Sequence, residues 1–415
     1  MIYDVIVAGG GPAGLMAAII AGQAGARVLL VEKMRDLGLK LKITGKGRCN
    51  LTNGAPLEKI IQQYHNGKFL YGALTRFTNR DLQAFFQERG LALKTERGNR
   101  VFPASDEAGD VIRVLKKELK KYTVEVKYSS PVREIIIVDG NIRGVKTADT
   151  VWYGRKVIIA TGGASYPGTG STGDGYELAR QAGHHIVPIR PALVPLESDD
   201  SWVFKLQGLT LKNVMVSVYV NEKKTSCEFG EMLFTHFGLS GPVILTLSYD
   251  IIQLLEEKKN RVEISIDLKP ALSAEQLDHR ILRDFNIQLN KQIKNSLFEL
   301  LPKKIIPIII ELANIPPEKP VNSVTKEERR RLIKLLKDLR IHITKPRPIA
   351  EAIVTAGGID IKEINPRTME SKLVKGLYFA GEIIDYHGRT GGYNLQGAFS
   401  TGYLAGISAG KKEAY

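Results

Sequence analysis

The chain is poor in cysteine and contains no long apolar run. Its 415 residues include two cysteines, Cys49 and Cys227, so a disulfide framework is excluded and a reducing, cytoplasmic location is expected. No stretch reaches the roughly 18 apolar residues of a membrane span. The apolar start carries Asp4 and lacks a basic leader, so we expect no signal peptide. No His, Cys, Asp or Glu set has metal-ligand spacing, and no metal is predicted.

Acidic residues are outnumbered by basic ones. The counts are 44 Asp+Glu against 59 Lys+Arg, a net charge of +15. Such a balance can indicate nucleic-acid binding, but the charge is spread along the chain. The basic stretch 326–340 has the helical spacing of a solvated face. An anionic cofactor or a small anionic substrate explains the basic surface more simply, so nucleic acid is the less favoured partner. We expect no membrane partner, and the oligomeric state stays open.

The N-terminal segment from Asp4 to Lys33 reads DVIVAGGGPAGLMAAIIAGQAGARVLLVEK. It predicts a strand over 4–8, a helix over 12–24 and a second strand over 27–31. Glycines between the first strand and the helix let the backbone approach a pyrophosphate at the helix N-terminus. Glu32 lies near the roughly 20-residue spacing expected for a carboxylate that accepts from a ribose hydroxyl. The segment therefore predicts a site for FAD or NAD rather than NADP.

The rest of the chain favours FAD over NAD. Two short strands, 134–138 and 142–146, meet at an Asp-Gly turn and precede a strand over 156–161. Near the C-terminus, a strand over 376–382 leads through a glycine-rich loop into a helix near Asn394. Such a helix start stabilises negative charge on the flavin pyrimidine. We predict an α/β fold with a Rossmann FAD-binding domain of the glutathione-reductase type. FAD should be held non-covalently.

Proline-marked loops near 190 and 349 divide the chain. We predict a discontinuous FAD-binding domain, 1–189 and 350–415. Residues 190–349 form an inserted, β-barrel-like plus helical domain on the substrate side. Its strands are expected over 190–270 and its helices over 271–340.

Four further motifs carry a family resemblance. They are TGKGRCNLTN (44–53), ATGGASYPGTGSTGDGY (160–176), FTHFGLSGP (234–242) and AGEIIDYHGRTGGYNLQGAFSTG (380–402). In this order and spacing, the chain resembles the BaiN/YhiN-like bacterial NAD(P)/FAD-dependent oxidoreductases. The resemblance implies a flavin between the FAD domain and the insertion. It leaves the substrate open, because some members are steroid or bile-acid enone reductases and others are aminoacetone oxidases.

The resemblance also assigns cofactor-binding residues. Glu382 stands where related enzymes usually carry an aspartate on the ribityl chain, and its longer side chain makes that bond less certain. The full set implied to hold FAD is Gly9, Gly11, Pro12, Ala13 and Gly14 at the pyrophosphate; Glu32 and Lys33 at the adenosine ribose; Val132 at adenine; Ala160, Thr161 and Gly162 along the pyrophosphate and adenosine; Glu382 at the ribityl chain; and Arg48, Cys49, Asn50, Gly392, Tyr393 and Asn394 at the flavin.

Candidate catalytic residues are few. Arg48 follows two glycines and could place positive charge near the flavin, although an ordinary surface arginine is the alternative. Tyr166 could donate a proton. His236 and His387 fit an active-site role as well as a structural one. Cys49 is expected to be packed and inert, and His184 and His185 to be structural.

A second glycine string is formed by Gly168, Gly170 and Gly173. We interpret it as an active-site loop rather than a second dinucleotide site. A docking place for nicotinamide-cofactor phosphates is the alternative.

The leading function is that of a FAD-dependent oxidoreductase. NAD(P)H would reduce the flavin, and a hydride would pass from flavin N5 to a small unsaturated or carbonyl substrate. Two alternatives stay open. One is an amine oxidase that uses oxygen, of the aminoacetone type. The other is an RNA-binding or tRNA-modifying flavoprotein, suggested by the net charge.

Overall fold

The computed structural model describes residues 2–257 and 259–411. The chain forms two compact units, Met1–Ala192 with Ile349–Tyr415 and Leu193–Pro348. The second unit lies within the expected insertion. The proposed boundary at 190 differs because strand β11 (Ile186–Ala192) continues to Ala192, where it pairs antiparallel with Val354 of β19 (Val354–Ile359).

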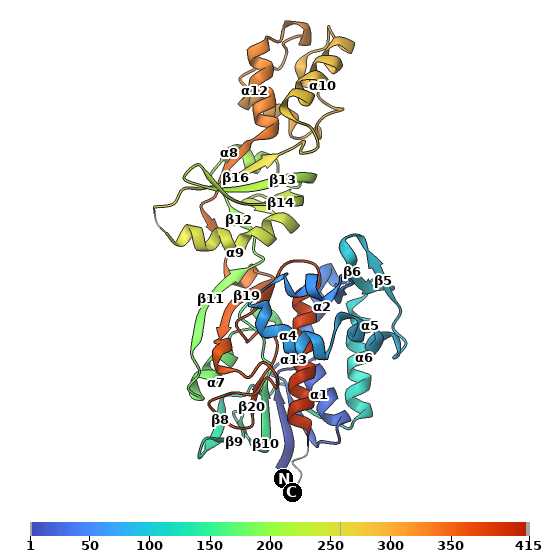
Figure 1. Ribbon diagram of the computed structural model, residues 1–415, viewed down its shortest axis with the longest axis vertical. Helices are drawn as coiled ribbons and strands as arrows, with labels where there is room; N and C mark the ends of the chain where they lie inside the picture. Colours follow the sequence, from blue (N-terminus) through green and yellow to red (C-terminus); the bar gives the residue numbers. More distant parts are fainter. Residues whose placement is uncertain (1, 258, 412–415) are drawn as a thin grey trace. The chain divides into compact units, whose positions relative to one another are not determined.

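The first unit is built on a Rossmann sheet (Figure 1). Strand β1 (Ile2–Ala8) runs parallel to β2 (Val28–Val31) and to β10 (Val151–Ile159). The sheet continues in parallel to β7 (Glu125–Lys127) beyond β2 and to β20 (Leu377–Phe379) beside β10. A meander of β8 (Glu134–Val138) and β9 (Asn141–Lys146) adds antiparallel strands. The predicted fold class is thereby confirmed.

Two small-residue helices pack closely over this sheet. Helix α1 (Pro12–Gln23) lies beside α13 (Tyr393–Gly410) (Figure 1). A Cβ added at Gly402 would lie 2.3 Å from the Ala13 oxygen, and one at Gly406 would lie 2.6 Å from the Ala17 oxygen. Glycine in α13 therefore lets the two backbones touch, and this contact brings the C-terminal helix to the nucleotide motif.

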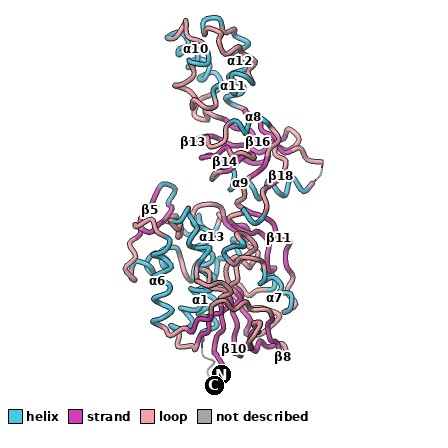
Figure 2. Tube along the Cα trace, turned by 180° about the vertical axis from the view of Figure 1, so that it is seen from behind, coloured by secondary structure: helices cyan, strands magenta, loops and turns pink. Residues whose placement is uncertain are grey.

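The other elements of the first unit surround this core (Figure 2). The helices are α2 (Leu39–Ile43), α3 (Leu57–Ile61), α4 (Gly67–Arg76), α5 (Asn79–Gln87), α6 (Ala108–Lys121) and α7 (Asp174–Gln181). The small strands are β3 (Thr52–Asn53), β4 (Tyr64–His65), β5 (Leu93–Glu96), β6 (Arg100–Pro103) and β21 (His387–Gly388).

The second unit joins an antiparallel sheet to a group of helices. The sheet contains β12 (Leu196–Glu197), β13 (Thr210–Val220), β14 (Lys223–Phe234), β15 (Gly238–Ser240), β16 (Val262–Asp267), β17 (Leu339–His342) and β18 (Lys345–Pro346). The helices are α8 (Ser201–Lys205), α9 (Pro242–Glu256), α10 (Ala274–Ile287), α11 (Ile306–Leu312) and α12 (Lys326–Lys337).

Helix α9 is a departure from the sequence expectation, because it lies within the stretch 190–270 that was expected to be strand-rich. Its run of Val, Ile and Leu resembles a buried strand, and only Pro242 at the first turn indicates a helix. Within residues 2–257 and 259–411, no helix combines the length and apolar character that a membrane span needs.

Candidate functional site

The first glycine turn leaves an uncapped helix start. Gly9 adopts φ +105°, and a Cβ at Gly14 would lie 1.8 Å from the Gly9 oxygen, so both positions need glycine. A Cβ at Gly11 would meet nothing within 4 Å, which leaves space over the start of α1. Gly11 gives α1 no side-chain cap, and its first turn holds no acidic residue. These features suit an anionic pyrophosphate.

Glu32 stands at the end of β2 and fixes the turn beside it. The side chain is 8% exposed and accepts hydrogen bonds from Gly10 N at 2.6 Å and from Met34 N at 2.7 Å. Burial raises the pKa of Glu32. The backbone N–H of Ser130 donates to the Glu32 carbonyl at 2.9 Å, so the loop that contains the partly buried Val132 begins beside this carboxylate. These residues form the adenosine end of the candidate site.

The second glycine string lies at this same end. A Cβ at Gly170 would lie 2.9 Å from Met34 Cγ. Lys33 ion-pairs with Asp174 at 2.8 Å and contacts Thr172. This loop therefore lies against the two residues that follow Glu32. Within the same motif, Gly162 faces Ser171.

Thr161 and Tyr166 are the residues of the 160–176 motif considered as ligand or substrate contacts. Thr161 Oγ1 is buried and has no hydrogen-bond partner in the described part of the chain. This oxygen faces Gly175, where an added Cβ would lie 1.9 Å from it, while the Thr161 backbone lies against Gly9. Tyr166 is half-buried with φ +54°, and its N–H donates to Ala350 O at 3.2 Å.

Glu382 forms a network that the sequence did not reveal. Lys40 Nζ donates to its two carboxylate oxygens at 2.7 and 3.0 Å and to Ser165 Oγ at 2.8 Å. The N–H of Thr355 donates to Glu382 Oε1 at 2.8 Å. Four separate segments thus meet at one carboxylate, at the position that the resemblance assigns to the ribityl chain. Lys40 and Lys42 stand two residues apart in similar sequence surroundings, so the sequence alone does not show which of them contacts Glu382.

The loop over 44–53 meets the start of α13. Gly392 has φ +96°, and a Cβ there would lie 2.4 Å from Thr52 O. With its amide oriented to satisfy both groups, Asn50 accepts from Gly392 N at 3.0 Å and donates to Thr52 O at 3.2 Å. Helix α13 has neither a side-chain cap nor an acidic residue in its first turn. Its positive end is therefore free to face a ligand.

The two residues that follow Gly392 contribute differently. Asn394 accepts from Gly388 N at 2.7 Å and donates to Gly388 O at 2.8 Å, so it holds the preceding loop. Burial raises the pKa of the Tyr393 hydroxyl. The Tyr64 hydroxyl donates to the Tyr393 carbonyl at 2.5 Å and anchors the helix start.

Arg48 and Cys49 have local partners. The Arg48 guanidinium contacts Glu96, bonds Asp106 at 2.7 Å and packs over the Phe102 ring at 4.2 Å. These carboxylates already balance its charge, so the guanidinium is less available to a flavin than the sequence suggested. Cys49 is fully buried, and burial raises the pKa of its thiol to about 12, so the thiol stays protonated and inert.

The two candidate histidines differ in environment and belong to different units. His387 is 7% exposed and stacks on His65 with ring centroids 5.1 Å apart. Burial, and then the charge of His65, lower the pKa of His387 to about 4, so it is neutral near pH 7. His236 is exposed in the turn between β14 and β15, edge-on to Phe237. As expected, His184 is structural, with ring bonds to Glu363 and Ser371.

The donor set fits FAD. Two uncapped helix starts offer backbone donors to an anionic group, and Glu32 offers an acceptor to a ribose. No group of three or more His, Cys, Asp or Glu side chains arranged to hold a metal is found among residues 2–257 and 259–411.

Comparisons with known proteins identify the family of this chain. Residues 3–408 match the HI0933-like protein Rossmann domain. The 3-dehydro-bile acid delta(4,6)-reductase of Clostridium scindens is 32% identical over 412 residues, which cover 98% of each chain. The ribosomal RNA dihydrouridine synthase of Escherichia coli is also 32% identical and covers 97% of this chain and 96% of its own. That of Haemophilus influenzae is 32% identical and covers 98% of each.

A solved structure supports the fold. The open conformation of a flavocytochrome c3 fumarate reductase aligns with a TM-score of 0.52 and 17% identity, over 99% of this chain and 78% of that one. The chain therefore belongs to the HI0933-like family, which includes the BaiN/YhiN-like proteins that its motifs resemble, and it is a FAD-dependent oxidoreductase.

Proposed function

We propose that this flavoenzyme reduces a carbon–carbon double bond conjugated to a carbonyl, with NAD(P)H as electron donor. The observation that carries the proposal is the junction of Asn50 and Gly392 at the uncapped start of α13. A helix start without acidic residues favours negative charge on a bound ring. Bound FAD supplies the hydride that such a reduction needs.

The protein then has to position the substrate and provide a proton. Addition of a hydride to one carbon of a conjugated double bond requires a proton at the neighbouring carbon. His387, with its lowered pKa, has no proton to give near neutral pH, and Arg48 is held by Glu96 and Asp106. Tyr166, half-buried in the 160–176 loop, is our first choice as donor. Exposed His236, in the other unit, is the second.

The names of the relatives support this reaction type. One relative is named as a bile-acid reductase and two as ribosomal RNA dihydrouridine synthases. Conversion of uridine to dihydrouridine saturates a double bond that is conjugated to a ring carbonyl, as is the double bond of an enone. Both chemistries fall within the proposal. The uracil of RNA is a specific second substrate class, favoured by the two synthase names and by the net charge of +15.

The test is anaerobic reoxidation. The purified protein is photoreduced and mixed either with a steroid enone or with an unmodified ribosomal RNA transcript, and flavin absorbance is followed. Return of the oxidised spectrum together with a saturated product supports the proposal. Peroxide release from an amine in air, without NAD(P)H, would instead identify an oxidase. The Tyr166→Phe variant should keep FAD and slow substrate reduction, whereas His236→Ala should do so only if His236 is the donor.

A further inference from the structure

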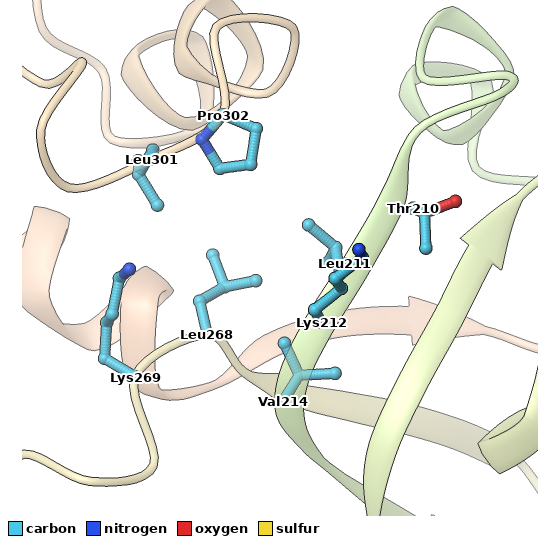
Figure 3. Close-up of a pocket in the computed structure, with 8 residues that line it drawn as sticks. All are labelled: Thr210, Leu211, Lys212, Val214, Leu268, Lys269, Leu301 and Pro302. Carbon is cyan, nitrogen blue, oxygen red and sulfur yellow. The ribbon is translucent and has the colours of Figure 1, made fainter. Parts of the chain in front are cut away.

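The second unit contains a cavity of about 260 Å³ that belongs to no part of the FAD site (Figure 3). It opens between the beginning of β13, the turn after β16 and the chain around Leu301. Its apolar lining is Leu211, Val214, Leu268, Leu301 and Pro302, and its polar lining is Thr210, Lys212 and Lys269. The lining therefore combines an apolar surface with two cations and includes no carboxylate.

The two lysines form no ion pair with the described residues. In the part of the chain that the structure describes, neither ammonium group lies within ion-pair distance of a carboxylate. The nearby carboxylates are occupied, because Asp267 pairs with Lys337 at 2.6 Å and Asp284 pairs with Arg280 at 2.7 Å. Burial, and then the charge of Arg280, lower the pKa of Lys269. An anion in the cavity would relieve this unfavourable burial of positive charge.

An aromatic ring lies close by in the sequence. Phe298 is 44% exposed, and the ammonium of Lys303 lies 5.7 Å from the centre of its ring. Between them, Leu301 and Pro302 line the cavity. Proteins bind single-stranded nucleic acids with cations that meet the phosphates and with exposed aromatic side chains on which the bases stack, and Phe298 precedes the cavity-lining Leu301 in the same stretch of chain.

We propose that this cavity binds a phosphate of a single-stranded RNA substrate between Lys212 and Lys269, with a neighbouring base on Phe298. The inference rests on the RNA substrate class of the proposed function and assigns that substrate a binding site in the inserted unit. The apolar lining contacts the ribose or the face of a base, and the two ammonium groups donate hydrogen bonds to the phosphate.

The test compares two double variants of the full-length, FAD-loaded protein. Lys212→Gln/Lys269→Gln removes the cavity charges. Lys223→Gln/Lys224→Gln removes the same charge from exposed positions at the other end of the β13–β14 hairpin. Binding of an unmodified ribosomal RNA transcript is measured over a salt series. We expect the cavity variant to bind about tenfold more weakly and its salt slope to fall by roughly 1–1.4, with little change in the control.

The outcomes separate this inference from the proposed function. Equal RNA binding by the wild type and the cavity variant would overturn the cavity assignment alone, and so would equal losses in the two variants. Reduction of a steroid enone by a wild type that neither binds nor reduces the transcript would overturn the RNA substrate class and the cavity assignment with it. Lysine-dependent binding of uridine monophosphate without RNA binding would show that the ligand is a free nucleotide and would refute the proposal. Phe298→Ala should also weaken RNA binding while leaving enone reduction unchanged.

Discussion

Replacing Lys40 with methionine should destabilise the FAD-binding unit by about 2 kcal/mol. Its ammonium makes three hydrogen bonds, two to Glu382 and one to Ser165. The two side chains of the ion pair are 18% and 20% exposed, which places the pair between a surface pair, at about 0–1 kcal/mol, and a buried one, at about 3–5 kcal/mol when a partner is removed. Methionine keeps most of the volume, so the loss reports the charge and its bonds.

The two tryptophans make this measurement selective. Trp152 lies in the first unit and Trp202 in the second, so a Trp202→Phe background leaves a reporter for the FAD-binding unit. Urea unfolding of the apoprotein gives the free energy of unfolding. Exposed Lys42 on the same helix provides the control, and Lys42→Met should change that free energy by less than about 0.5 kcal/mol.

A double-mutant cycle with Glu382→Gln isolates the pair. We expect a coupling energy of about 1–2 kcal/mol between Lys40 and Glu382. Equal effects of Lys40→Met and Lys42→Met, or a coupling below about 0.5 kcal/mol, would refute the argument that this pair stabilises the unit.

Three further predictions follow from the same geometry. Glu32→Ala should weaken FAD binding by about 1–3 kcal/mol in titrations of apoprotein, because the ribose loses a charged acceptor; an unchanged dissociation constant would remove Glu32 from the ribose. Because the pKa of His387 is lowered from 6.5 to about 4, the unfolded chain binds the extra proton first. Stability should therefore be full above pH 6.5 and fall by about 2–3 kcal/mol towards pH 4, and His387→Gln should reduce this slope in urea unfolding measured at each pH. Gly406→Val should cost about 1–3 kcal/mol or more, since its Cβ would lie 2.6 Å from the Ala17 oxygen. The same change at Gly109, where a Cβ would meet nothing within 4 Å, should cost less in the same unfolding assay.

The nucleotide-binding half of the fold could be predicted because its signals are local. Strand β8 has the predicted bounds, and α1 begins at the predicted Pro12. Glycine at a sharp turn and alternating apolar residues act within a few positions of each other, so the sequence carries them directly. Helix α9 was missed because an apolar run in a buried helix has the same composition as one in a buried strand.

The site itself depended on tertiary contacts. Lys40 was not identified because only its approach to Glu382, far along the chain, distinguishes it from Lys42. Arg48 was expected at the flavin because it follows two glycines, yet Glu96 and Asp106 hold its guanidinium. Charge pairing between distant segments leaves no periodic pattern, so it was not visible in the sequence.

The pairing of β11 with β19 bears on how this chain acquires its structure. Ala192 and Val354 are paired across these two strands. The chain segments that enter and leave the inserted unit are therefore held side by side. Once β11 and β19 pair, Leu193–Pro348 is a closed loop, and the entropic cost of bringing its two ends together has already been met. The hydrophobic core of the inserted unit is then built from residues within this loop. The sequence of that loop can consequently change without altering the strand pairs of the nucleotide-binding half.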